Sequence, residues 1–271
     1  MTQPVFRSIA DLRAQIADWK GDGARIGLVA TMGALHDGHL SLIEAAKADK
    51  IIVSIFVNPT QFAAHEDFDT YPRDEAADFH ALAPTAAAAI FAPEAAEIYP
   101  EDFATDIQVG GAAEGLEAAA RPHFFGGVAL AVVKLLMQTQ ADCAVFGEKD
   151  YQQLCVIRQI VRDLNIPTDV IAAPTIREAD GLAMSSRNAY LDPDARRIAG
   201  QLNVILRELA ENHAEEEATR QLLEAGFDAV DYAVIREAET LRIPDEKTAA
   251  RRALIAARLG KVRLLDNMAA L

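Results

Sequence analysis

Short apolar runs alternate with longer amphipathic segments along the first two thirds of the chain. The runs are rich in β-branched or small apolar residues and too short for long helices; they span 26–30, 51–57, 87–91, 143–146 and 168–172. The segments between them carry apolar residues at spacings of three and four, as amphipathic helices do; they span 39–48, 73–82, 128–139 and 151–164. This alternation predicts buried strands connected by helices.

Alternating strands and helices favour a parallel sheet covered on both faces, with ligands at the carboxyl ends of the strands. We therefore expect an α/β protein with a Rossmann-like parallel-sheet domain over residues 1–176.

The pattern changes after about residue 175. A polar loop over 177–188 is followed by a helix over 193–211 and a second helix that ends at residue 225. A strand over 231–236 and two apolar runs around Gly260, within 254–265, come after them. These elements predict a smaller C-terminal α+β domain over residues 177–271. We expect it to act as a lid, with the functional site between the two domains.

Composition narrows the class of protein. The chain has 271 residues, of which 51% are hydrophobic and 25% charged, so a disordered chain, a collagen and a coiled-coil rod do not fit. Lys and Arg number 26 against 41 Asp and Glu, and the net charge of -15 opposes binding to nucleic acids or anionic membranes. Any anionic ligand must therefore meet locally concentrated positive groups.

The chain shows no sign of a targeting segment. Residues 1–10 lack the apolar core of a secretory signal, and no run approaches the roughly 18 apolar residues of a membrane span. Cys143 and Cys155 lie twelve apart inside apolar segments, which favours buried thiols over a disulfide or a zinc site. We expect a cytoplasmic protein.

The first polar cluster follows the run 26–30 and reads Thr-Met-Gly-Ala-Leu-His-Asp-Gly-His over 31–39. Backbone amides at a helix start favour anions, Gly38 permits close approach, and His36 and His39 can donate hydrogen bonds to phosphate oxygens. The His-x-Gly-His pattern is typical of adenylyl-transfer enzymes. Two surface histidines near a turn are the alternative, which the position directly after the first strand makes less favourable.

Two further clusters follow later strands. Asn58 and Gln61 come after the run 51–57, where their amides can bind a hydroxy acid, although Asn58-Pro59 also favours a simple turn. In the segment 146–154, Lys149 can neutralise a phosphate, and Gln153 lies one helical turn beyond it. Asp150 could hold a ribose hydroxyl or cap the following helix.

The fourth cluster is the polar loop 177–188. Its hydroxyls, Ser185 and Ser186, precede Arg187, a combination that suits a phosphate clamp, and Gly181 allows the backbone freedom that closure needs. A plain linker is the alternative for Met184 to Asn188. Four polar clusters after consecutive strands of one sheet predict one crevice.

In order and spacing, these clusters resemble the pantothenate synthetase (pantoate:β-alanine ligase) family. The resemblance extends through nearly the whole chain, over 31–43, 54–62, 66–73, 145–154, 177–191 and 256–267. It implies an ATP-dependent, AMP-forming amide ligase of pantothenate and coenzyme A biosynthesis. Pantoate would attack the ATP α-phosphate to give pantoyl adenylate and pyrophosphate, and β-alanine would then displace AMP. Such chemistry needs positioning and charge neutralisation more than a protein nucleophile.

The resemblance also implies roles for single residues. His39, as an acid, His36 and Lys149 would be catalytic. The ATP-binding residues would be Met32, Gly33, His36, Gly38, His39, Gly147, Glu148, Lys149, Asp150, Ile176, Met184, Ser185, Ser186 and Arg187. The pantoate-binding residues would be Met32, Asn58, Gln61 and Gln153, with Gln61 also near β-alanine. Mg²⁺ would accompany ATP, with no protein ligand assigned, and the partners would be the three substrates and a second copy in a homodimer, without nucleic acid or membrane.

One stretch departs from the family pattern. The family usually reads Arg-Pro-Gly-His-Phe-Arg-Gly-Val, whereas residues 121–128 read Arg-Pro-His-Phe-Phe-Gly-Gly-Val, with Phe124 in place of the His and Gly126 in place of the second Arg. His123 could turn into the neighbouring space or be exposed. The change makes the identity of the amine substrate less certain than adenylation, and two alternatives stay open: a nucleotidyltransferase that stops after adenylyl transfer, and a nucleotide sensor without turnover.

Overall fold

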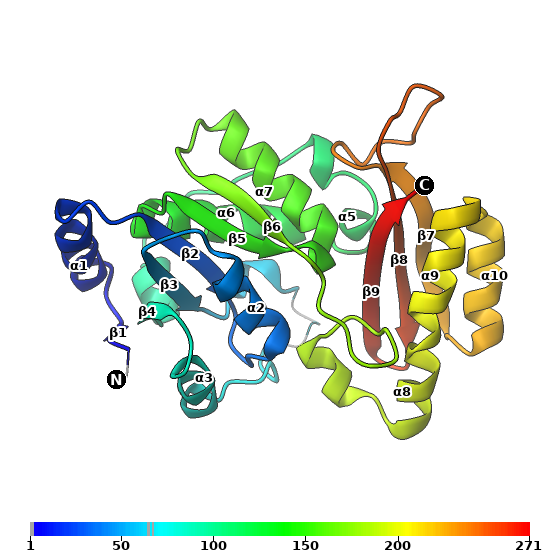
Figure 1. The fold of residues 1–271 in the computed structure, drawn as a ribbon, viewed down its shortest axis with the longest axis horizontal. Helices are drawn as coiled ribbons and strands as arrows, with labels where there is room; N and C mark the ends of the chain where they lie inside the picture. Colours follow the sequence, from blue (N-terminus) through cyan, green and yellow to red (C-terminus); the bar gives the residue numbers. More distant parts are fainter. Residues whose placement is uncertain (1–2, 64–65, 67) are drawn as a thin grey trace.

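The structure, a computed structural model, describes residues 3–63, 66 and 68–271 (Figure 1). Met1 and Thr2, within the N-terminal segment considered above, and Asp67, within the family-like stretch 66–73, lie outside the described residues. Two sheets form the molecule: a parallel sheet in the order β1-β4-β3-β2-β5-β6 and an antiparallel sheet in the order β7-β8-β9. The predicted fold class is confirmed.

Five strands of the parallel sheet form where the apolar runs predict them. The sheet consists of β1 (Val5–Phe6), β2 (Ile26–Thr31), β3 (Lys50–Ile55), β4 (Ala87–Phe91), β5 (Cys143–Gly147) and β6 (Asp169–Ala173). Neighbouring strands pair in parallel, with Ile26 opposite Lys50 and Gly27 opposite Cys143. The chain builds outward from β2 through β3 and β4 on one side, and from β5 to β6 on the other. The loops after β2 and β5 therefore diverge and leave a crevice at the carboxyl ends of the strands.

Helices cover both faces of this sheet. They are α1 (Ile9–Gly21), α2 (Asp37–Ala45), α3 (Glu75–Leu82), α4 (Ala95–Ile98), α5 (Glu117–Ala120), α6 (Phe124–Thr139) and α7 (Tyr151–Asp163), with the short 3-10 helices η1 (Pro59–Gln61), η2 (Gly111–Ala113) and η3 (Glu148–Asp150). Because side chains alternate along a strand, Leu28 packs with α1, α6 and α7 on one face, while Val29 packs with α2 and α3 on the other.

The C-terminal unit places helices on one face of the antiparallel sheet (Figure 1). Its elements are η4 (Ser186–Tyr190), α8 (Pro193–Ala199), α9 (Gln201–Asn212), α10 (Glu215–Ala225), β7 (Ala229–Glu237), β8 (Arg251–Leu259) and β9 (Val262–Ala270). Leu202 and Leu206 of α9 form a core with Ile255 of β8. Leu241 and Leu254 instead belong to the large core of the N-terminal unit, so an apolar interface joins the two units.

The structure corrects several predicted helix bounds and adds two elements. The single helix expected over 193–211 is two helices that meet at Gly200, where an added Cβ would lie 2.8 Å from Asp180 Oδ2. Helix α6 begins at Phe124 instead of residue 128, and the N-terminal elements β1 and α1 were not predicted at all. None of the helices among the described residues combines the length and apolar character needed to cross a membrane.

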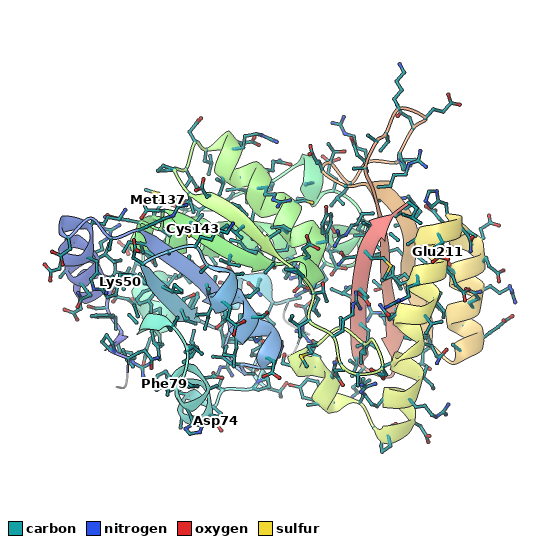
Figure 2. All side chains as sticks on the ribbon, viewed as in Figure 1. Lys50, Asp74, Phe79, Met137, Cys143 and Glu211 are labelled. Atoms are coloured by element: carbon teal, nitrogen blue, oxygen red, sulfur yellow. The ribbon has the colours of Figure 1, made fainter. Side chains whose placement is uncertain are left out.

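Both cysteines are buried free thiols, as predicted. Cys143 lies on β5 with no exposed surface, and Figure 2 shows it in the N-terminal unit, far from the antiparallel sheet. Cys155 lies on α7 and is 4% exposed. Burial raises the pKa of the Cys155 thiol to about 11.

Candidate active site

A cavity of about 1320 Å³ lies at the carboxyl ends of β2, β3 and β5 and reaches the antiparallel sheet. All four predicted polar clusters line it. The predicted site residues on its wall are Met32, His36, Gly38, His39, Asn58, Gln61, Gly147, Lys149, Asp150, Gln153, Ile176, Met184, Ser185, Ser186 and Arg187. Gly33 and Glu148 lie behind the wall instead, where Gly33 faces Asp78 and Glu148 binds Arg252.

The two histidines form a stacked pair at the start of α2. Their ring centroids are 4.0 Å apart, and the His36 backbone N–H donates to His39 Nδ1 over 3.4 Å. A Cβ at Gly38 would lie 2.9 Å from the His36 ring, so any larger residue at this position would displace the ring. Because Nδ1 of His39 accepts a hydrogen bond, the ring proton is assigned to Nε2. His39 therefore keeps one N–H donor for a ligand.

Burial determines the protonation of this pair. Burial, together with His36 and Lys149, lowers the pKa of His39 to about 3. Burial and the Lys149 charge also lower the pKa of His36. Both imidazoles are therefore neutral at neutral pH in the protein alone. In this state His39 offers its Nε2–H as a hydrogen-bond donor.

Asp78 of α3 holds the loop that leads into the histidine pair. Its buried carboxylate accepts hydrogen bonds from the backbone N–H groups of Ala34, over 3.1 Å, and Leu35, over 2.7 Å. Ala34 adopts a left-handed conformation with φ 50°, which costs free energy for a residue with a Cβ. Sequence reasoning missed Asp78, because an Asp inside a predicted helix carries no signal of a contact 44 residues away.

The second cluster is a chain of amides whose orientation the backbone fixes. Asn58 Oδ1 accepts from the Thr60 N–H over 3.3 Å, and its Nδ2 donates to the Gly127 carbonyl over 3.1 Å. Nδ2 also donates to Gln61 Oε1 over 3.1 Å, so Gln61 turns its Nε2 toward Met32 Sδ, 3.0 Å away. Gln61 therefore offers a donor to an acidic or hydroxyl oxygen. Asn58 is 2% exposed and orients Gln61 from behind.

In the third cluster, two neighbouring glutamines have different environments. Lys149 Nζ lies 3.4 Å from Asp150 Oδ1, and Gln153 lines the cavity one turn further along α7. Gln152 is 3% exposed, and its Nε2 donates to the backbone carbonyl of Ala112 over 3.0 Å. Gln153 is thus available for a ligand, whereas Gln152 holds a loop.

The fourth cluster is only partly free to move. Arg177 forms a two-bond ion pair with the buried Asp266, over 2.6 and 2.9 Å, and the loop closes through a bridge between Arg177 and Ala183. Ser185 Oγ accepts from the Arg187 N–H over 3.3 Å. The Arg187 guanidinium lies 5.9 Å from the Tyr71 ring centroid. The loop is also held at its far end, where Asn188 Nδ2 donates to Glu178 Oε1 over 2.7 Å and to the Ala183 carbonyl over 3.1 Å.

The stretch that departs from the family pattern has its own contacts. Arg121 stacks on Phe124 at 3.9 Å, pairs with Glu66 over 2.6 Å and donates to the Gln61 carbonyl over 3.1 Å. Arg121 and Phe124 both line the cavity, while His123 is exposed. Of the two alternatives for His123, the structure shows exposure.

No preformed metal centre appears within residues 3–63, 66 and 68–271, since no three His, Cys, Asp or Glu side chains there are grouped to hold an ion. Asp150 is the carboxylate beside Lys149 on the cavity wall, and its side chain is 48% exposed. A single carboxylate beside a lysine is a small ligand set, which Mg²⁺ accepts where phosphates and water supply its other ligands.

Comparisons with known proteins cover the whole chain. The chain is 54% identical to the pantothenate synthetase of Mesorhizobium japonicum, over 99% of this chain and 98% of the relative. It is 51% identical to that of Caulobacter vibrioides, over 99% of both chains. A pantothenate synthetase structure from Thermus thermophilus superposes with a TM-score of 0.89 at 41% identity, covering 98% of this chain and 99% of that one.

A second solved structure adds a liganded relative. The pantoate-beta-alanine ligase of Francisella tularensis, complexed with beta-gamma ATP and beta-alanine, superposes with a TM-score of 0.86 at 35% identity, covering 98% of this chain and 97% of that one. A family model described as pantoate-beta-alanine ligase matches residues 4–269. The match spans the histidine pair, the amide chain, the lysine turn (Glu148–Asp150) and both sheets. Together with relatives that are about 50% identical over their full length, it shows that this chain belongs to the pantoate-beta-alanine ligase family of enzymes.

Proposed function

We propose that this chain joins pantoate to β-alanine at the expense of ATP, through a pantoyl adenylate. The observation that carries the proposal is the convergence of phosphate-binding donors, His36, His39 and Lys149, with the oriented amide of Gln61 in one cavity. Family membership and the ATP and beta-alanine bound to the Francisella tularensis relative support it.

The first step needs charge neutralisation. A pantoate carboxylate oxygen bonds to the α-phosphorus of ATP while the bond from that phosphorus to the bridging oxygen breaks, and pyrophosphate leaves. Negative charge increases on the phosphate oxygens, where Lys149 and the Nε2–H of His39 stabilise it. Because His39 is neutral in the protein alone, it acts by donating a hydrogen bond, and no side chain becomes covalently modified.

The second step uses the same site. The β-alanine amine bonds to the acyl carbon, the carbon–oxygen bond to the phosphate breaks, and AMP leaves as the amine loses a proton. Gln61 and Gln153 hold the pantoyl group throughout, and Gln61 also lies near the amine. Holding two reactants in one cavity makes each step effectively unimolecular.

Residues around these groups hold the nucleotide. Ser185, Ser186 and Arg187 bind the phosphates, while Met32, Gly38, Gly147, Ile176 and Met184 border the nucleotide. Gly33 and Glu148 contribute from behind the wall, by shaping the turns that carry His36 and Lys149. Asp150 is the carboxylate that would hold Mg²⁺ bound to ATP, and the ion would supply positive charge at the phosphates.

A product analysis tests the proposal. Purified protein with ATP, Mg²⁺ and pantoate should release pyrophosphate, and addition of β-alanine should yield AMP and a product with the mass of pantothenate. A nucleotidyltransferase would stop at pyrophosphate, and a sensor would give neither product. No pyrophosphate at saturating substrates would overturn the adenylation step.

Further properties rest on the family resemblance and remain proposals. Residues 1–176 form the substrate-binding domain, and residues 177–271 form a smaller domain that completes the cavity. The enzyme works in the cytoplasm as a homodimer. Light scattering on the purified protein, with a mass near 59 or 29.3 kDa as the two outcomes, tests the dimer directly.

A further inference from the structure

A side chain of the C-terminal sheet binds the backbone on both sides of Lys149. Asn267 of β9 is 3% exposed, and its Nδ2 donates to the carbonyl of Glu148 over 2.9 Å and to the carbonyl of Lys149 over 2.8 Å. These carbonyls belong to the two peptide groups that flank the Lys149 Cα. A single amide thus restrains the backbone from which the lysine side chain extends.

Arg252 of β8 fixes the orientation of that amide. Its Nε donates to Asn267 Oδ1 over 2.7 Å, and a second nitrogen donates to Glu148 Oε2 over 2.9 Å. The guanidinium also stacks on Tyr151, the first residue of α7, at 4.0 Å. Because arginine only donates hydrogen bonds, Asn267 must turn Oδ1 toward Arg252 and Nδ2 toward the two carbonyls.

Asn267 has no donor left for a ligand, although it borders the cavity. Both of its N–H groups bind backbone carbonyls. Its effect on a substrate must therefore pass through the residue that it holds. Catalytic groups must be held to within a fraction of an ångström, and such supporting contacts control that precision.

We propose that Asn267 is a positioning residue for Lys149, and that Arg252 keeps it in the orientation that this requires. The C-terminal sheet thereby sets the geometry of the phosphate-binding lysine across the interface between the two units. This inference rests on the proposed function, in which Lys149 acts on the ATP phosphates.

The variant Asn267→Asp tests the proposal with almost no change in shape. A carboxylate keeps the contact with Arg252 but replaces two donors with an oxygen that faces two carbonyl oxygens. We expect kcat for pantoate-dependent pyrophosphate release to fall about 10- to 100-fold. The KM for pantoate should change less than kcat, because Gln61 on η1 lies outside the turn that carries Lys149. Loss of folded protein would instead lower the apparent kcat only in proportion to the folded fraction.

Hydrogen exchange provides a readout that does not depend on turnover. In the ligand-free Asn267→Asp protein, amide exchange should become faster over residues 148–153 and stay unchanged over 37–45. Arg252→Met keeps an apolar stem against Tyr151 and removes the donors, so it should give the same pattern with a smaller loss of kcat. Arg236→Ala, on β7 and paired with Glu215 inside the C-terminal unit, is the matched control and should retain wild-type rates.

The outcomes separate the two proposals. If the wild-type protein forms no pyrophosphate, the proposed function fails, while the exchange experiment still reports whether Asn267 holds the lysine turn. If the wild type is active and folded Asn267→Asp keeps kcat within threefold with unchanged exchange, the positioning role is wrong. If Asn267→Asp does not fold, the same two measurements on Arg252→Met decide.

Discussion

His39 and Lys149 lie partly buried at the cavity wall, and a donor fixed before the reaction stabilises charge without reorganisation. Removing one such donor typically costs on the order of a hundredfold in rate. We therefore expect His39→Ala and Lys149→Ala each to slow pantoyl adenylate formation by about that factor, measured as pyrophosphate released in a single turnover. Circular dichroism should show an intact fold, and near-normal rates in both variants would remove them from the catalytic set.

The low pKa of His39 predicts a specific loss of stability in acid. Between about pH 6.5 and pH 3, the unfolded chain binds a proton at this residue and the folded chain does not, so stability falls as the pH falls through this window. At pH 5 the loss reaches at most about 2 kcal/mol, because the side chain is only partly buried.

Replacing the imidazole with a group that does not titrate isolates this contribution. His39→Gln should lose less unfolding free energy than the wild type between pH 8 and pH 5, as measured by urea denaturation. Equal losses in the two proteins would mean that His39 titrates in the folded state as it does in the unfolded chain.

Single residues differ in how far the sequence alone predicts them. His36, His39, Gln61 and Lys149 were predictable because each closely follows a strand that apolar periodicity identifies. Asp78 and Asn267 were not, because their partners lie 43 or more residues away and neither belongs to a polar cluster at a strand end. Asn58 lines the cavity as predicted, but its amide oxygen and nitrogen already bind the backbone of Thr60 and Gly127. The contact with Gly127 could not be read from the sequence.

At the scale of elements, the contact between α6 and η1 is the tightest near the site. A Cβ at Gly127 would lie 2.2 Å from the Thr60 carbonyl oxygen and 2.7 Å from the Gln61 nitrogen. Gly127→Ala must therefore displace η1 and with it Gln61. We expect a loss of about 1–3 kcal/mol in unfolding free energy together with a raised KM for pantoate.

Gly21→Ala is the matched control, because no atom lies within 4 Å of the added Cβ at the end of α1. It should be neutral or slightly stabilising, since glycine in a helix costs roughly 0.5–1 kcal/mol relative to alanine. An unchanged KM for pantoate in a folded Gly127→Ala protein would show that η1 does not position Gln61.

The loop 182–188 is the element expected to respond to nucleotide. Arg177 and Asp266 tie its base, so protection on adding ATP and Mg²⁺ should concentrate after Met184. We expect slower amide exchange there, and Arg187→Ala should weaken this protection and slow adenylation together. Unchanged exchange at saturating nucleotide, with normal activity of Arg187→Ala, would make the segment a linker.

Elements whose apolar periodicity is strong were the predictable ones. Five strands of the parallel sheet, all except β1, formed where expected, and strands β8 and β9 contain the two apolar runs on either side of Gly260. The break between α8 and α9 could not be read from the pattern, because the close approach of Asp180 to Gly200 exists only in the folded chain. Helix α1 was missed because Leu12 and Ile16 are its only fully buried apolar side chains.

At the scale of the whole molecule, the interface between the units contains a buried carboxylate. Glu117 accepts from Tyr232 over 2.7 Å and from Arg263 over 2.6 Å, beside the packed Leu254. Such an interface predicts that both units unfold together. Fluorescence of Trp19, the single tryptophan, reports the N-terminal unit, and far-UV circular dichroism reports both, so their urea transitions should coincide.

Breaking the interface tests its contribution. Glu117→Ala leaves Arg263 without one of its buried partners and should cost about 3 kcal/mol or more. Exposed Glu101→Ala is the control and should change stability by less than about 0.5 kcal/mol. Separate transitions in the wild type would show that the two units are independent.

Because Cys143 and Cys155 are buried, we expect neither native cysteine to react with thiol-reactive dyes in the folded protein. Maleimides attack thiolates, and burial protects both sulfurs, with the pKa of Cys155 raised in addition. Cysteines introduced at exposed Met137 and Glu211, which Figure 2 shows on opposite units, would therefore take up a donor and an acceptor dye without removal of either native cysteine. The wild-type background thus lends itself to single-molecule energy transfer, in which any change in the separation of the two units during turnover would be recorded as a distance over time.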